Sequence, residues 1–180
     1  MTWKTLSSTI KYQNRYMTVT EDELITDHGD HVTYGMVRKE PFSVVIPWDG
    51  RRTLLVGQYR PSADFYSWEF PMGHAESDAP TVAAKRELQE ETGLIAQDLI
   101  QIATFYPALG TMNQLGYVYV ATSWVIGNQD LDVAEKAMQL KWLTLRELEA
   151  MITDGTIKDG PSITSYYLLK QYLNRQSLLP

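Results

Sequence analysis

The chain has 180 residues, of which 44% are hydrophobic and 21% charged, and its formal net charge is −6. This length and composition fit one globular domain with a sizeable core and argue against a disordered chain. The acidic balance disfavours a nucleic acid partner, because duplex binding needs a basic face. Since the sequence contains no cysteine, disulfides and thiolate zinc sites are excluded.

The sequence shows no sign of export or of a membrane anchor. The first residues lack a basic region followed by an apolar core, so no signal peptide is predicted. The most apolar segment, Leu115–Ile126, is too short to cross a bilayer and alternates like a strand. We therefore expect a soluble cytoplasmic protein without a membrane partner.

Residues 1–40 are predicted to form an arm of antiparallel strands. The strand patterns cover Thr5–Ile10, Met17–Glu23 and His31–Arg38. The run Asp27-His28-Gly29-Asp30 predicts the turn between the last two strands. Because two histidines supply too few ligands for a metal site, we interpret His28 and His31 as surface turn residues.

Two strands that begin the core are predicted next, at Phe42–Trp48 and Thr53–Tyr59. Asp49-Gly50 between them is a strong hairpin turn signal. We therefore expect the two strands to lie side by side in the core.

The end of the second core strand carries residues that suit a phosphorylated ligand. Arg60 can donate a bidentate pair of hydrogen bonds to a phosphate or ribose oxygen, although a surface ion pair is the alternative. Trp68 offers a flat face for a purine, together with Tyr59 and Phe65, although core packing is the alternative for Trp68.

A helix is predicted between Asp78-Ala79-Pro80, a helix start with proline in the first turn, and the stop at Thr92-Gly93. At roughly 100° per residue, three carboxylates share one arc of this helix, those of Glu87, Glu90 and Glu91. A glutamate-rich face is usually solvated. The apolar stripe of this helix is thin, however, so we interpret the acidic face as a site for a hard divalent cation and a phosphate.

The remaining elements alternate strands and helices. Strands are predicted at Leu99–Tyr106, Leu115–Trp124 and Glu135–Leu143, with a loop at residues 107–114. Thr144 is a candidate N-cap, with Glu147 three residues on, for a helix at Leu145–Thr153. A final helix is predicted at Ser162–Gln176.

The stretch from Gly73 to Leu94 resembles the Nudix box, the signature of hydrolases that cleave nucleoside diphosphates linked to another moiety. The closing half of the pattern is complete, with Arg86, Glu87, Leu88, Glu90, Glu91, Gly93 and Leu94. The opening half is one residue shorter than the family spacing, and Asp78 stands at the early glutamate position. The Gln58-Tyr59-Arg60 and Trp68–Gly73 segments are similar to those that precede the box in ADP-ribose pyrophosphatases.

This resemblance implies a fold and a domain organisation. The expected fold is α/β (α+β), a Nudix-type α/β/α sandwich in which a small mixed curved sheet lies between the Nudix helix and the C-terminal helices. Residues 1–180 would form a single Nudix hydrolase domain. Residues 41–180 would be the catalytic core, and the strand arm of residues 1–40 would pair across a homodimer.

The resemblance also implies the residues of the active site. Mg²⁺ or Mn²⁺ would be held by Glu87, Glu90, Glu91 and the backbone carbonyl of Met72. Arg86 would orient the glutamates through a charge-assisted hydrogen bond. The expected substrate contacts come from Gln58, Arg60, Trp68, Glu69 and Gly73.

One catalytic position departs from the resembled branch. Where those enzymes place a glutamate after a Tyr-Pro-x-x-Gly loop, this chain has Gln114. An amide can coordinate a metal or orient a water but cannot act as a carboxylate base, so a base would come from Glu90, Glu91 or a metal-bound hydroxide. Two hypotheses follow: metal-dependent hydrolysis, with ADP-ribose giving AMP and ribose 5-phosphate, or a catalytically weak or inactive module that binds a nucleotide sugar or related metabolite.

Overall fold

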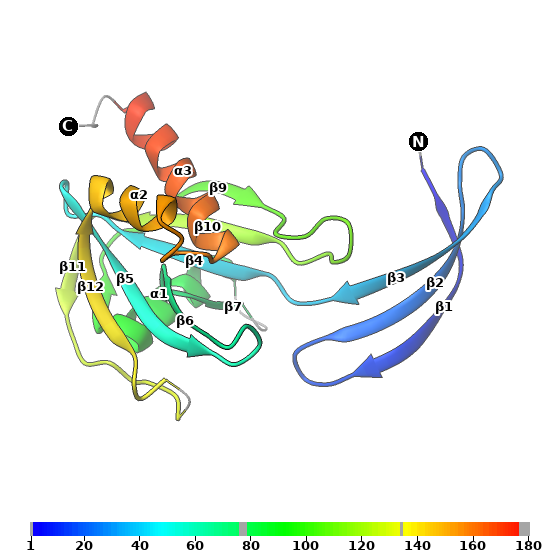
Figure 1. Cartoon of the computed structure of the whole chain (residues 1–180), viewed down its shortest axis with the longest axis horizontal. Coiled ribbons are helices and arrows are strands. Elements are labelled where there is room, and N and C mark those ends of the chain that lie inside the picture. Colours follow the sequence, from blue (N-terminus) through cyan, green and yellow to red (C-terminus); the bar gives the residue numbers. More distant parts are fainter. Residues whose placement is uncertain (1, 76–78, 134, 177–180) are drawn as a thin grey trace.

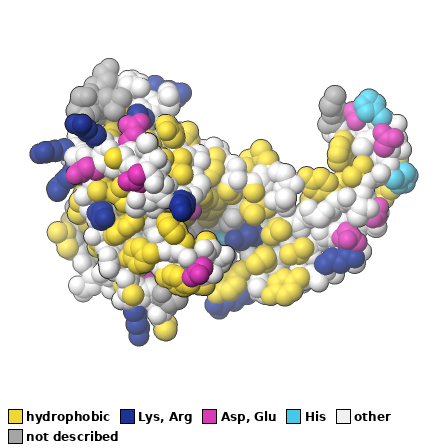
Figure 2. Space-filling view, viewed as in Figure 1, with side chains coloured by type: hydrophobic (Ala, Val, Ile, Leu, Met, Phe, Trp, Pro, Cys, Tyr) yellow, Lys and Arg dark blue, Asp and Glu magenta, His cyan; other side chains and the backbone are white. Residues whose placement is uncertain are grey.

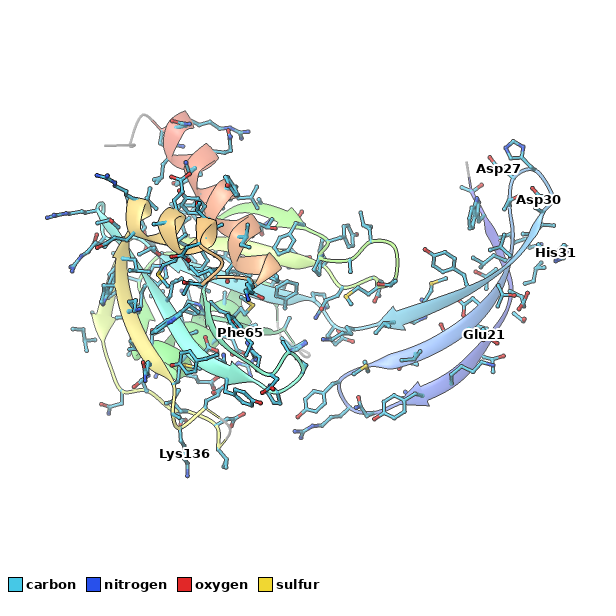
Figure 3. All side chains as sticks on the ribbon, in the orientation of Figure 1. Glu21, Asp27, Asp30, His31, Phe65 and Lys136 are labelled. Atoms are coloured by element: carbon cyan, nitrogen blue, oxygen red, sulfur yellow. The ribbon has the colours of Figure 1, made fainter. Side chains whose placement is uncertain are left out.

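The computed structural model describes residues 2–75, 79–133 and 135–176 and shows a layered core from which an arm projects (Figure 1). The arm is a three-stranded antiparallel sheet in the order β1-β2-β3, with β1 at Lys4–Gln13, β2 at Thr18–Ile25 and β3 at His31–Arg38. His28 and His31 are exposed, as predicted, and Figure 3 shows His31 with Asp27 and Asp30 at the far tip of the arm.

The arm is fastened to the core by the loop at residues 107–114. The Val37 N–H donates to the Thr111 carbonyl at 2.8 Å, and the Tyr34 hydroxyl donates to the Gly110 carbonyl at 2.5 Å. The Lys39 N–H donates to Asn113 Oδ1 at 3.0 Å. These bonds fix the orientation of β3 where the chain enters the core.

The described residues of the core form three sheets. A mixed sheet has the order β7-β4-β10-β9, in which β4 and β10 are parallel, and the others have the orders β12-β5-β6 and β11-β8. The strand bounds are β4 Phe42–Pro47, β5 Arg52–Arg60, β6 Phe65–Glu69, β7 Met72–His74, β8 Leu94–Ala96, β9 Ile100–Phe105, β10 Gly116–Ala121, β11 Trp124–Ile126 and β12 Gln139–Thr144.

The two strands expected side by side, β4 and β5, meet only at their turn. A single bridge joins Trp48 to Thr53, and the strands then enter different sheets. Every residue of β4 is buried, because the strand lies between two helical layers and pairs with β10 and β7 instead. The turn signal at Asp49-Gly50 therefore located the reversal but not the strand pairing.

In the part of the chain that the structure describes, three helices complete the core: α1 at Pro80–Thr92, α2 at Leu145–Thr153 and α3 at Gly160–Arg175. Gly93 ends α1 in the left-handed conformation with φ 74°, which a glycine adopts without steric cost. Thr144 and Glu147 form the predicted capping box of α2. Asp159 caps α3, which begins at Gly160, earlier than the sequence pattern indicated.

Alternating side chains of the mixed sheet build the two halves of the core. Val44, Ile46 and Val118 pack in the cluster that contains Leu148 of α2 and Leu169 of α3. On the opposite face, Val45 of β4 and Tyr119 of β10 pack in a second cluster, which includes Ala84 and Leu88 of α1. The expected α/β/α sandwich with its small mixed sheet is confirmed.

Within the described part of the chain, none of the helices combines the length and the apolar character needed to cross a bilayer.

Candidate active site

A cleft of about 1190 Å³ lies where α1, the ends of β5 and β7 and the loop at residues 127–138 meet. Nine of the sequence-predicted site residues line it: Gln58, Arg60, Met72, Gly73, Arg86, Glu87, Glu90, Glu91 and Gln114. Residues far apart in the sequence are thus brought together around one space.

Glu91 is the most deeply buried carboxylate that lines the cleft, with 3% of the residue exposed. Its Oε2 accepts a hydrogen bond from the Met72 N–H at 3.1 Å. Burial, and then the negative charges of Glu87 and Glu135, raise the pKa of Glu91 well above the usual glutamate value. A bound cation would stabilise the ionised form of a carboxylate that is buried beside other negative charges.

Glu87 lies directly against the backbone of Gly73. A Cβ atom at position 73 would lie only 2.1 to 2.3 Å from the carboxylate atoms of Glu87, so this approach requires glycine. Arg86 Nη2 donates to Glu87 Oε1 at 3.0 Å and to the His74 carbonyl at 3.1 Å. Arg86 therefore ties the acidic face of α1 to strand β7.

The loop at residues 127–138 adds carboxylates that the sequence patterns did not single out, those of Asp130, Asp132 and Glu135, and all three line the cleft. The loop is fastened to the end of α1, because Gln129 Nε2 donates to the Glu91 carbonyl at 2.6 Å and the Asp130 N–H to the Glu90 carbonyl at 3.0 Å. The acidic residues just before β12 were the available signal, but acidic loops are common on protein surfaces.

The pKa of Glu90 is raised, first by burial and also by the charges of Asp130, Asp132 and Glu135, while Arg86 acts in the opposite direction. Glu90 therefore lies at the junction between the acidic face of α1 and the acidic loop.

These oxygen ligands fit a hard divalent cation. Glu87, Glu90, Glu91 and the Met72 carbonyl are the donors that could hold one, and carboxylate and carbonyl oxygens are those that Mg²⁺ and Mn²⁺ prefer. Among residues 2–75, 79–133 and 135–176, no three acidic, histidine or cysteine side chains already converge as a preassembled metal centre. The burial of Glu91 beside like charges is the observation that favours a cation here.

Arg60 is held in the cleft by Glu69, which lies behind it. Arg60 Nε donates to Glu69 Oε1 at 2.8 Å, and Arg60 Nη2 donates to Glu69 Oε2. The bonds to Glu69 raise the pKa of Arg60, and the charges of Glu91 and Asp159 act in the same direction. Glu69 thus orients a cleft residue without lining the cleft itself.

Trp68 lies outside the cleft. Gly57 pairs with Trp68 across β5 and β6, which places Trp68 on the sheet face opposite to Gln58 and Arg60. There its ring meets Tyr66 edge-on, with centroids 5.8 Å apart, and Lys141 Nζ lies 4.2 Å from the ring centroid. The structure therefore favours core packing over the predicted substrate contact for Trp68.

Gln114 lines the cleft, but its amide is engaged with the backbone. Its Nε2 donates to the Glu40 carbonyl at 3.0 Å, and only 7% of the residue is exposed. The other departure from the box pattern, at Asp78, lies outside the described residues.

The turn between β1 and β2 also reaches the cleft, where it contributes Arg15 and Tyr16. The Arg15 guanidinium carbon lies 4.4 Å from the centroid of the Tyr16 ring, so the two side chains stack. Sequence patterns gave no reason to place this turn beside the acidic helix.

Comparisons with known proteins agree with this arrangement. The NUDIX domain model matches residues 38–165, and the model of the nucleoside diphosphate sugar hydrolase N-terminal domain matches residues 3–37. A CMP-5'-(N-acetyl-N-hydroxy-3-aminopropyl)phosphonate hydrolase from Streptomyces rubellomurinus is 25% identical over 166 residues, which cover 91% of this chain and 80% of the relative.

Two further comparisons concern proteins named for ADP compounds. An ADP-ribose pyrophosphatase from Bacillus subtilis is 25% identical over 138 residues, which cover 74% of this chain and 75% of the relative. The crystal structure of an ADP compounds hydrolase shares the fold, with a TM-score of 0.86 at 18% identity over 99% of this chain and 98% of that one. The chain therefore belongs to the Nudix hydrolase family.

Proposed function

We propose that this protein hydrolyses the diphosphate bond of a nucleoside diphosphate linked to another moiety, with ADP-ribose as substrate and AMP and ribose 5-phosphate as products. The observation that carries the proposal is the buried Glu91 carboxylate, raised in pKa by burial and by Glu87 beside it, in a cleft that Arg60 also lines. This arrangement combines an acidic cation site with a guanidinium that can donate to a phosphate.

In the proposed reaction a water oxygen forms a bond to one phosphorus, and the bond from that phosphorus to the bridging oxygen breaks. The bridging oxygen leaves with the second phosphate, and the attacking water gives up a proton. A Mg²⁺ or Mn²⁺ ion held by Glu87, Glu90, Glu91 and the Met72 carbonyl would neutralise the diphosphate and lower the pKa of water. Arg60 donates to a phosphate oxygen and thereby stabilises the charge that develops there.

Glu135 is the proposed acceptor of the proton from water. It lines the cleft, and its charge raises the pKa values of both Glu90 and Glu91, which places it close to the two helix carboxylates. The Gln114 amide cannot take this role and is bonded to the Glu40 carbonyl. The carboxylate absent at position 114 is thus replaced by one from the loop at residues 127–138.

The arm is proposed to serve both the substrate and the assembly, with residues 41–180 as the catalytic core. Tyr16 at the arm turn offers a ring on which a nucleobase can stack. Trp3, Leu6 and Ile10 are large apolar residues exposed in the arm, and Figure 2 shows hydrophobic side chains along it. We propose that two arms cover these residues in a homodimer, and light scattering that gave a monomer at micromolar concentration would contradict this.

The function is tested by incubating the purified chain with ADP-ribose, other nucleotide sugars, dinucleotides and nucleoside triphosphates, each with Mg²⁺ or Mn²⁺. Chromatography of the products should show AMP and ribose 5-phosphate in equal amounts from ADP-ribose. Tight binding of ADP-ribose without release of AMP would instead support the non-catalytic module.

A further inference from the structure

The amino-terminal end of α3 lies at the cleft, because Pro161 in its first turn is one of the residues that line the cleft. Ser162 Oγ accepts a hydrogen bond from the Phe70 N–H at 2.9 Å, across a sequence separation of 92 residues. The Ser162 N–H in turn donates to Asp159 Oδ2 at 2.8 Å, the cap of the helix. Asp159, Ser162 and Phe70 therefore form a continuous hydrogen-bonded connection between α3 and the segment at residues 69–72.

This segment needs such a connection because it joins two sheets. Strand β6 ends at Glu69 in one sheet and β7 begins at Met72 in another, so Phe70 lies between the two ladders. Phe70 is fully buried, and a buried backbone N–H that lacks a partner is costly. Ser162, itself 2% exposed, supplies the acceptor.

The residues on either side of Phe70 hold two groups of the proposed active site. Glu69 binds Arg60 through both carboxylate oxygens. Two residues after Phe70, the Met72 N–H donates to Glu91 Oε2 at 3.1 Å. A shift of the Phe70 amide would therefore move the guanidinium and the buried carboxylate together.

Asp159 adds an electrostatic link to the same group. Burial raises the pKa of Asp159, and its interactions with Glu69 and Arg60 show that the helix cap lies within reach of this ion pair. The charges of Glu91 and Asp159 also act on Arg60, whose hydrogen bonds go to Glu69. The orientation of Arg60 therefore depends first on Glu69 being held in place.

We propose that Ser162 and Asp159 are positioning residues of the active site, because by fixing the Phe70 amide they hold Glu69 against Arg60 and Met72 against Glu91. Neither residue needs to touch the substrate. The inference rests on the proposed hydrolase function, since it assigns Arg60 and Glu91 to the same reaction.

The helix itself provides a matched control. Ser165 lies one turn after Ser162, is fully buried, and its Oγ has no hydrogen-bond partner among the residues that the structure describes. Ser162→Ala and Ser165→Ala therefore remove the same atom from two buried positions of one helix. They differ in the bond to Phe70.

The experiment compares both variants with the wild type in steady-state hydrolysis of ADP-ribose, well below their unfolding temperatures. Ser162→Ala should lower kcat/KM by about tenfold, with a higher KM as well as a lower kcat, because small displacements of positioned groups are costly in rate. Ser165→Ala should keep both constants within about twofold of the wild type. A purely structural role for Ser162 would lower the folded fraction, and hence kcat, with KM unchanged.

A second readout does not depend on activity. In ¹H–¹⁵N spectra the Arg60 Nε–H, bound to Glu69, should exchange slowly with solvent in the wild type and in Ser165→Ala, and faster in Ser162→Ala. If Ser162→Ala does not fold, Ser162→Cys, which is nearly the same size and a weak acceptor, takes its place. Unchanged Arg60 exchange and an unchanged KM in the Ser162 variant would overturn the proposal. A wild type that cleaves no substrate would refute the proposed function, while the exchange of Arg60 would still decide whether Ser162 positions it.

Discussion

Helices α1 and α2 differ in the side chains at their ends. Helix α2 begins with a complete capping box, in which Glu147 Oε2 accepts from the Thr144 N–H at 2.8 Å and Thr144 Oγ1 accepts from the Glu147 N–H at 3.2 Å. Helix α1 begins at Pro80 after the N-cap position Ala79, and no side chain among the described residues caps it. Its last two turns carry Glu87, Glu90 and Glu91, where the helix dipole is negative.

The contrast shows that α2 is arranged for local stability and α1 for its chemistry. Negative charges at a helix C-terminus and a buried carboxylate both oppose folding. Groups that oppose folding in this way and face a cleft are candidates for function. Substitutions of the acidic residues of α1 should therefore lower activity without lowering stability, and loss of the α2 cap should lower stability without lowering activity.

The largest effect is expected for Glu91→Gln. The amide oxygen keeps the bond from the Met72 N–H, but the loss of the charge should lower kcat by about a thousandfold, the equivalent of about 4 kcal/mol. The unfolding temperature of the metal-free protein should rise, because the raised pKa means that the ionised Glu91 is disfavoured in the folded state. A Glu91→Gln protein that kept the wild-type kcat, or that unfolded at a lower temperature, would contradict the functional interpretation of α1.

Glu135→Gln should lower kcat by about a hundredfold, the range for a lost general base. The unfolding temperature should change little, because Glu135 lies in a loop at the cleft. A variant with the wild-type kcat would place the base elsewhere.

Gly73→Ala should lower kcat/KM by about tenfold to a hundredfold. The new Cβ atom would lie 2.1 to 2.3 Å from the Glu87 carboxylate atoms, so that carboxylate would have to move. The matched control is Gly110→Ala, since a Cβ atom at Gly110 meets nothing within 4 Å. Equal kinetics in the two variants would show that the contact between Glu87 and Gly73 does not matter for the reaction.

The smallest effect on activity is expected for Thr144→Ala. Loss of an N-cap costs about 1 kcal/mol, which lowers the unfolding temperature by about 2–4 °C in a chain of this size. Backbone and side-chain bonds from Thr144 lower the pKa of Glu147, so its contribution is present above the ordinary glutamate pKa and is lost as the pH falls through the lowered value. The difference in unfolding temperature between the wild type and Thr144→Ala should therefore become smaller as the pH is lowered. The kcat/KM of the variant should equal that of the wild type.

The two helices also show which parts of the fold the sequence could predict. Both helices carry local signals, since Pro80 and Gly93 bound α1 and the Thr144–Glu147 pattern begins α2, and the structure has both helices at the predicted places. Local signals could not pair the strands, because β4 pairs with β10 and β7 rather than with its neighbour β5. That choice depends on burial from both sides, a tertiary effect.

The site shows the same limit. The acidic face of α1 follows from helical spacing, but Asp130, Asp132 and Glu135 join it only because the loop is bonded to the end of the helix. The side of a sheet on which a residue lies depends on strand register, which placed Trp68 in the core and Arg60 in the cleft. Contacts made by folding, such as that of Ser162 with Phe70, leave no pattern in a single sequence.

The most direct test of the proposed hydrolysis is the rate of AMP release from ADP-ribose by the wild type and Glu91→Gln, measured with excess Mg²⁺. We expect AMP and ribose 5-phosphate in equal amounts from the wild type, and a rate about a thousandfold lower from a variant that is folded and at least as stable. Equal rates from the two proteins, or bound and uncleaved ADP-ribose in the wild type, would contradict it.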